Sequence, residues 1–295
     1  MNKTKTDGVF FFWSAAILLC MVIAIFALIF ASCSGEKDKP AKHNDDDVTI
    51  ESTETDTPPT DESPKDDANT GITDTTPEKP DENKDTSEPT EARLAETADA
   101  GQEYIDKFYF LGDSTTYGMT VYAKDHVDAS QILTPASGTL TLNRWSIENL
   151  LNNSDGSEKS FADTFATIKP EYLMVTLGSN GVSFMGEDSF IPVYTEMVKT
   201  IQQASPDTKI ILNTIYPTCS DYQYKDSISL EKITTANLWI EQIANDLGVR
   251  FLNTYEVLAG SDGYLPKELS NGDGIHLNEE GFSKIFTYIR THAWN

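Results

Sequence analysis

The sequence predicts an α/β protein, a three-layer α/β/α sandwich with a five-stranded parallel sheet, and three observations support this prediction. Five short segments are almost entirely apolar, as strands are when both faces of a parallel sheet are covered. Helical patterns separate them, so strands and helices alternate. The stretch from residue 101 to residue 295 has the size of one domain. The expected strands are 108–111, 131–133, 172–177, 209–215 and 249–252, and the expected helices are 161–168, 190–204, 230–247 and 279–292.

The strands differ in how clearly the sequence marks them. The first is an apolar run that stops at Gly112, and the second is only three residues long. The third is the clearest, because the turn signal Lys169-Pro170 precedes a run of buried-strand length. The two apolar segments that follow complete five. In such a sheet we expect the ligand site beyond the carboxyl ends of the strands.

The first 33 residues predict export from the cytoplasm. An apolar run over 9–31 has no charge and is long enough to cross a membrane. It ends in Ala31-Ser32-Cys33, which resembles a bacterial lipobox with lipidation at Cys33, although Phe30 stands where that signal usually has Leu. An uncleaved signal anchor and ordinary secretion are the alternatives. All three place the rest of the chain outside the cytoplasm, and we expect it at the extracellular face of the bacterial cell membrane.

Residues 34–100 predict a disordered spacer. Asp, Glu, Thr, Pro and Lys dominate this segment, and it has no aromatic residue, so it cannot bury enough apolar surface to offset its conformational entropy. It would hold a domain over 101–295 away from the membrane, unless it is only an acidic solubility tail. The net charge of −25 is shared between spacer and domain, which argues against nucleic acid as a partner.

The three cysteines supply neither a disulfide framework nor a metal cluster for the domain. Cys20 lies in the apolar run, Cys33 at its end, and Cys219 alone in the domain, where we assign it no function. We therefore expect no metal site.

Four separate pieces of the domain carry the residues needed for acyl transfer through serine. Ser114 follows the first strand and Asn180 follows the third, so both are expected at the same edge of the sheet. Gly138 lies in the loop after the second strand. His276 is the only one of four histidines with an Asp three residues earlier in a turn, Asp273, which could fix its tautomer. An Asp-x-x-His motif by itself is more often a surface turn. Together with Ser114 at the end of a strand, it favours a catalytic pair.

These pieces resemble the sequence blocks of the SGNH hydrolase superfamily, also called the GDSL esterase/lipase family. Gly112-Asp113-Ser114-Thr115 resembles the first block, Ser137-Gly138 the second, Gly178-Ser179-Asn180 the third, and Asp273-Gly274-Ile275-His276 the last. The resemblance implies a flavodoxin-like α/β/α fold. It also implies that Ser114 is the nucleophile, that His276 and Asp273 complete the triad, and that Ser114, Gly138 and Asn180 form the oxyanion hole. One departure is Gly181, where the family usually has Asp.

We expect a membrane-tethered serine esterase that hydrolyses small acyl esters, O-acetyl groups on carbohydrate above all, and needs no cofactor. Asp113 is expected to fix its loop rather than to act as the catalytic acid. The chain has no Gly-x-Ser-x-Gly motif, which disfavours the α/β-hydrolase fold. Lysophospholipid hydrolysis, acyl transfer and a catalytically silent wall-binding module are the alternatives. We expect a monomer.

Overall fold

The computed structural model describes residues 90–294. The predicted membrane segment, the lipidation site Cys33 and most of the predicted spacer lie outside the described residues. Within residues 90–294, no helix is long and apolar enough to cross a membrane.

The five-stranded parallel sheet is confirmed, with strand order β2-β1-β5-β6-β7. Its strands are β1 (Phe108–Gly112), β2 (Ile132–Leu133), β5 (Tyr172–Thr176), β6 (Lys209–Asn213) and β7 (Arg250–Leu252). Each expected strand is present, and the ends differ by at most two residues. The order reverses at β1, which pairs with β2 on one side and β5 on the other, so the ends of β1 and β5 lie at the point where such folds bind ligands.

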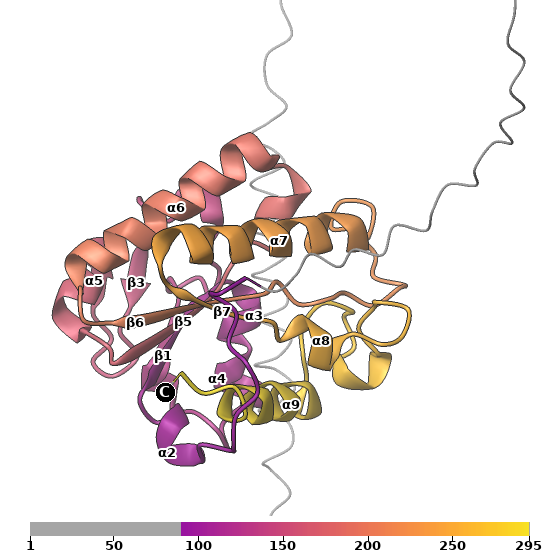
Figure 1. Cartoon of the computed structure of the whole chain (residues 1–295), viewed down its shortest axis with the longest axis horizontal. Coiled ribbons are helices and arrows are strands. Elements are labelled where there is room, and N and C mark those ends of the chain that lie inside the picture. Colours follow the sequence, from indigo (N-terminus) through magenta and orange to yellow (C-terminus); the bar gives the residue numbers. More distant parts are fainter. Residues whose placement is uncertain (1–89, 295) are drawn as a thin grey trace, which may run out of the picture. The chain divides into compact units, whose positions relative to one another are not determined.

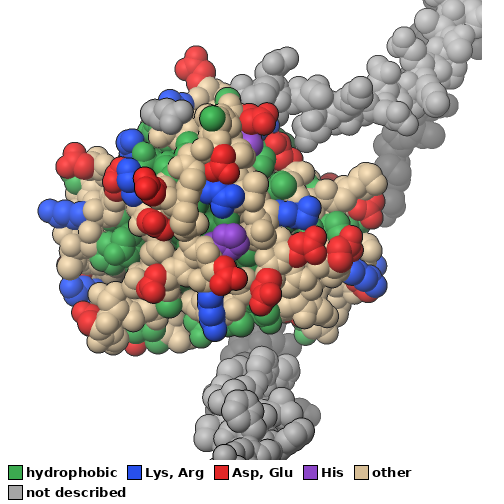
Figure 2. Space-filling model, turned by 90° about the horizontal axis from the view of Figure 1, so that it is seen from below, with side chains coloured by type: hydrophobic (Ala, Val, Ile, Leu, Met, Phe, Trp, Pro, Cys, Tyr) green, Lys and Arg blue, Asp and Glu red, His purple; other side chains and the backbone are tan. Residues whose placement is uncertain are grey.

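Helices cover both faces of the sheet, as Figure 1 shows. On one face lie α5 (Phe161–Ile168), α6 (Glu187–Ala204) and α7 (Leu230–Leu247). On the other lie α2 (Gln102–Ile105), α4 (Met119–Tyr122), α8 (Tyr255–Leu258) and α9 (Glu279–Arg290). Two hydrophobic clusters result, one on each side of the sheet. Acidic and basic side chains are interspersed on the face seen in Figure 2.

Local signals set the ends of the long helices. Ser229 caps α7 by accepting a hydrogen bond from the Lys232 N–H, and Gly248 ends it in the left-handed conformation. Asn278 caps α9 in the same way, by accepting from the Gly281 N–H. An antiparallel hairpin of β3 (Asn149–Leu151) and β4 (Glu158–Ser160) is also present, and the sequence pattern does not predict it.

The folded part of the chain begins before residue 101, which is the predicted start of the domain. Ala92 is buried, and Arg93 forms a parallel bridge with Phe251 of β7. The Arg93 guanidinium also donates to the buried carboxylate of Glu241 on α7, at 2.5 and 3.1 Å. This segment therefore extends the sheet beyond β7, although its composition resembles that of the spacer.

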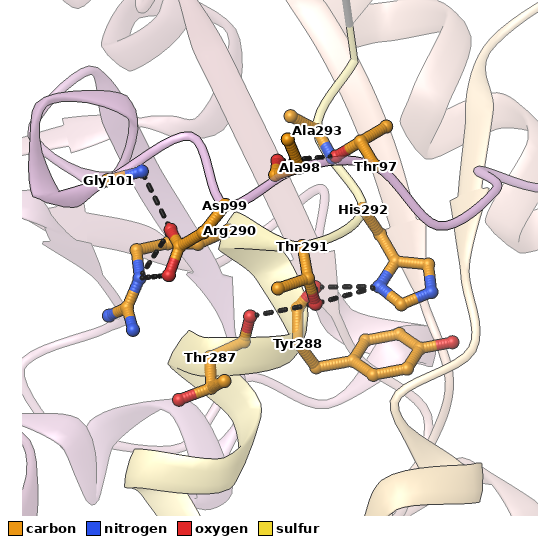
Figure 3. Close-up of polar contacts among 10 residues, drawn as sticks. All are labelled: Thr97, Ala98, Asp99, Gly101, Thr287, Tyr288, Arg290, Thr291, His292 and Ala293. Atoms are coloured by element: carbon orange, nitrogen blue, oxygen red, sulfur yellow. Dashed lines mark hydrogen bonds and ion pairs between the residues drawn. The ribbon is translucent and has the colours of Figure 1, made fainter.

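The residues that follow in this segment contact the C-terminal end of α9 (Figure 3). Arg290 donates to the Asp99 carboxylate at 3.1 Å, and the Ala293 N–H donates to the Thr97 hydroxyl at 3.1 Å. The Asp99 carboxylate also accepts from the Gly101 N–H, at 2.8 Å. The bonds from Arg290 and Ala293 pair residues almost two hundred positions apart, which composition alone does not predict.

Candidate active site

Ser114 lies directly after β1, at the first position of the short helix α3 (Ser114–Tyr117). Gly112, the last residue of β1, approaches β5 so closely that a Cβ would collide with the Thr176 carbonyl. Asp113 caps α3 by accepting from the Thr115 N–H. The N–H of Ser114 has no partner within the helix, since the first turn of a helix leaves its N–H groups free.

His276 lies beside Ser114, and Asp273 lies on the far side of its ring. Nε2 of His276 is 2.8 Å from Oγ of Ser114, and Nδ1 is 2.6 Å from Oδ2 of Asp273. The other Asp273 oxygen accepts the backbone N–H groups of Ile275 and His276, each at 2.9 Å. Asp273 thus has both oxygens held, and a neutral His276 whose Nδ1 carries the proton can accept the Ser114 proton at Nε2.

A tight loop between the last 3₁₀ turn, Lys267–Leu269, and α9 brings His276 over the sheet. The Asn271 N–H donates to the His276 carbonyl at 2.9 Å, which closes the loop on itself. Gly274 adopts a φ of 85°, where a side chain would be strained, and its carbonyl accepts the Cys219 N–H at 2.8 Å. Cys219 is a buried residue that packs behind this loop.

The surroundings of Asp273 favour its charged form. Partial burial opposes ionisation, but hydrogen bonds from the His276 backbone, the His276 ring and the Ile275 backbone outweigh it, so the pKa of Asp273 lies below its usual range. The carboxylate is therefore negatively charged at neutral pH, as is required to stabilise an imidazolium.

Asn180 and Gly138 differ in how well they are placed to bind an oxyanion. The side-chain Nδ2 of Asn180 is buried and has no hydrogen-bond partner among residues 90–294, so it is a free donor. Gly138 has a φ of 75° and packs against the ring of Tyr117, one turn after Ser114. Its N–H, however, donates to the Pro135 carbonyl at 2.8 Å. The expected donor at Gly138 is thus engaged elsewhere.

Below the site, Asp113 holds two loops together, as predicted for a loop-fixing residue. Its buried carboxylate accepts from the Thr115 backbone, the Thr115 hydroxyl and the Ser179 hydroxyl. Ser179 is the functional candidate that the sequence analysis missed. The available signal was its position: Asp113 and Ser179 follow neighbouring strands, where their side chains can meet.

Two buried tyrosines stand near Asp113. Burial, and secondly the charge of Asp113, raise the pKa values of Tyr194 and Tyr216 well above their usual range, so both remain neutral phenols. A cavity of about 10 Å³, which Asp113, Ser179 and Tyr216 help to line, lies here. It is too small for a substrate, since a volume of this size holds about one water molecule.

The domain residues that the structure describes include no group of three or more His, Cys, Asp or Glu side chains arranged to hold a metal ion. The triad geometry itself supplies a nucleophile, a base and a charged acid.

A family model provides independent information on this site. The model of the GDSL-like lipase/acylhydrolase family matches residues 110–284, which contain Ser114, Asn180, Asp273 and His276. The chain belongs to the GDSL-like lipase/acylhydrolase family. The predicted resemblance is confirmed, and this acylhydrolase is a hydrolase by family.

Solved structures with low sequence identity resemble this acylhydrolase. A GDSL-like lipase from Bacteroides thetaiotaomicron is 19% identical with a TM-score of 0.47, over 65% of this chain and 89% of that chain. The periplasmic domain of a lipopolysaccharide acetyltransferase from Salmonella ser. Paratyphi A is 18% identical with a TM-score of 0.39, over 63% and 82%. An acetylxylan esterase from Geobacillus stearothermophilus is 15% identical with a TM-score of 0.40, over 64% and 94%. No curated protein matches the chain in sequence.

Proposed function

We propose that this acylhydrolase is a serine esterase in which Ser114 is the nucleophile, His276 the general base and Asp273 the residue that orients it. The observation that carries the proposal is the continuous hydrogen-bonded series from Ser114 Oγ to His276 Nε2, at 2.8 Å, and from His276 Nδ1 to Asp273, at 2.6 Å. Both distances lie within the range needed for proton transfer between a nucleophile and its base.

The reaction follows from these positions. Ser114 Oγ attacks the ester carbonyl while His276 takes its proton, and charged Asp273 stabilises the resulting imidazolium. The free N–H of Ser114 and the unpaired Nδ2 of Asn180 donate to the oxyanion. His276 then gives its proton to the leaving alcohol, and water hydrolyses the acyl-enzyme by the same steps. Gly138 can act as a third donor only after its N–H leaves the Pro135 carbonyl.

The proposed substrates are small acyl esters, above all O-acetyl groups on carbohydrate. The cavity of about 10 Å³ below the site is too small to take an acyl chain, and Ser114 and His276 are themselves partly exposed. The acidic chain favours a neutral substrate over an anionic lipid surface. Hydrolysis would occur outside the cytoplasm, with the domain tethered through the predicted membrane segment and spacer.

The test of the reaction is a p-nitrophenyl ester series from acetate to octanoate, measured on the wild-type chain in detergent and on Ser114→Ala. We expect hydrolysis that falls steeply as the acyl chain lengthens and that is lost in Ser114→Ala. Release of acetate from an acetylated oligosaccharide tests the carbohydrate assignment separately. Faster hydrolysis of octanoate than of acetate would contradict the short-acyl specificity.

The test of the tether is metabolic labelling with a fatty-acid probe in the wild type and in Cys33→Ser. Lipidation at Cys33 predicts label in the first and none in the second. Membrane retention without label in the wild type would favour the uncleaved anchor.

A further inference from the structure

Asp113 is a buried carboxylate held by hydrogen bonds alone. Its side chain is 1% exposed and makes no ion pair with any Lys, Arg or His of residues 90–294. Three donors compensate for its burial: the Thr115 N–H at 3.0 Å, the Thr115 hydroxyl at 2.7 Å and the Ser179 hydroxyl. Leaving a buried carboxylate oxygen without one of its hydrogen-bond donors is costly, so each of these bonds is expected to hold its segment firmly in place.

The Ser179 bond is the only one of the three that links two loops. Thr115 belongs to the same loop as Asp113, whereas Ser179 lies 66 residues away, in the loop after β5. Both residues follow the last paired positions of β1 and β5, Gly112 and Thr176. The bond therefore ties the loop that carries Ser114 to the loop that carries Asn180.

The hydrogen bonds of Asn180 do not link it to the loop of Ser114. Its side-chain Nδ2 has no hydrogen-bond partner within the part of the chain that the structure describes. Its backbone carbonyl accepts from the Ser183 hydroxyl, within the same loop, at 2.8 Å. Gly181, the next residue, has no side chain with which to hold the loop. Ser179, the residue next to Asn180, is the side chain that connects this loop to the nucleophile.

We infer that the hydrogen bond from Ser179 to Asp113 positions the Asn180 amide relative to Ser114. This inference rests on the proposed function, in which Asn180 donates to the oxyanion. Ser179 acts through Asn180 and is a positioning residue rather than a catalytic one. Its effect should therefore be on turnover, since the oxyanion carries its charge in the transition state, and not on substrate binding.

The test compares Ser179→Ala, Ser179→Cys and Ser179→Thr with Ser205→Ala in the full-length chain. Ser205 is also buried and its hydroxyl is also hydrogen-bonded, to Thr208 at the C-terminal end of α6, so it is a matched control for the loss of a buried serine bond. We expect Ser179→Ala to lower kcat about tenfold or more, with KM within about twofold, because small displacements of catalytic groups cost rate rather than binding. Ser179→Cys, which keeps the size but is a weaker donor, should lower kcat less.

The remaining expected results separate positioning from stability. Ser179→Thr, which keeps the hydroxyl, should retain most of the wild-type kcat, and Ser205→Ala should leave kcat unchanged even where its thermal midpoint falls as far as that of Ser179→Ala. Equal kcat in Ser179→Ala and Ser205→Ala would overturn the inference, and so would a loss expressed only in KM.

Failure of the proposed function gives a different result. A wild type that neither hydrolyses esters nor reacts with a fluorophosphonate would refute the esterase, whatever Ser179 does. Crystal structures of Ser179→Ala and Ser205→Ala then test the positioning directly. The Asn180 amide should shift relative to Ser114 only in the first, and an unmoved amide would refute the inference.

Discussion

Nε2 of His276 lies 2.8 Å from Oγ of Ser114, although 162 residues separate them in the chain. Ser114 reaches this position from the end of β1, and His276 from the loop that precedes α9. His126, by contrast, stacks on Phe286 of α9 at a ring distance of 4.9 Å. The two histidines therefore offer a direct test of which one is the base.

His276→Ala should remove nearly all ester hydrolysis, because no other base among residues 90–294 is hydrogen-bonded to Ser114. The loss of a triad member lowers kcat by about 10⁴ or more. His126→Ala is the control and should keep most of the activity. Steady-state kinetics of both variants on p-nitrophenyl acetate decide the matter, and equal losses would refute the assignment.

Asp273→Asn should lower kcat by about 10⁴, because an amide cannot hold the imidazole in the tautomer that accepts the serine proton. The lowered pKa of Asp273 adds a pH dependence. The Asp273 carboxylate is negatively charged above its usual pKa of about 4. It loses this charge only as the pH falls below that value. Titration of Asp273 should therefore not affect kcat between about pH 5 and 8. The measurement compares the pH–rate profiles of the wild type and of Asp273→Asn. A loss of activity near pH 5 that is present in the wild type and absent in the variant would contradict this expectation.

Asn180→Ala should lower kcat by about 10² with little change in KM, because the missing donor serves the transition state. The rate of labelling of Ser114 by a fluorophosphonate should fall as well. Asn152→Ala is the control, because the Asn152 side chain only accepts a hydrogen bond from the Ser154 N–H in an exposed turn. An effect of Asn180→Ala on KM alone would show that Asn180 binds the ground state.

Removal of residues 90–100 should destabilise the domain. A fragment that begins at residue 90 keeps the buried Ala92, the bridge from Arg93 to Phe251 and the pair of Asp99 with Arg290, whereas one that begins at residue 101 loses all three. The shorter fragment should unfold at a lower temperature, by several degrees for each kcal/mol lost in a domain of this size. Equal thermal midpoints for the two fragments would show that the domain begins at residue 101.

Glu241→Gln should destabilise the domain at neutral pH by about 1 to 3 kcal/mol, because it removes a charged acceptor from Arg93 and Thr90. Burial works against ionisation of Glu241, but hydrogen bonds from Arg93 and Thr90 outweigh it and lower its pKa. Because its pKa is lower in the folded state, the Glu241 carboxylate stabilises the fold at pH values above its unfolded-state pKa of about 4.3. This stabilisation is lost as the pH falls through the folded-state pKa.

The difference in thermal midpoint between the wild type and Glu241→Gln should therefore shrink below about pH 4. Glu231→Gln, on an exposed part of the same helix, is the control and should show no such trend. A constant difference across this range would show that the Glu241 charge is not what stabilises the segment.

Much of the architecture could be predicted because it depends on local patterns. Apolar runs such as 172–177 identify strands, and α7 coincides with its predicted range because Ser229 and Gly248 mark its ends. The positions of Ser114 and Asn180 followed from the rule that parallel strands present their carboxyl ends at one edge. The roles of these residues were implied by the family resemblance, and they remain proposals.

The tertiary structure decided what depends on contacts between distant segments. The sequence by itself determined the strands, the helices and the candidate residues, because hydrophobic period, caps and turn residues act over a few positions. It could not place residues 90–100, whose polar composition gave no sign that Arg93 would meet Glu241. Nor could it show that Pro135 takes the Gly138 N–H, or that Ser179 reaches Asp113, because strand register and loop path decide which polar groups meet.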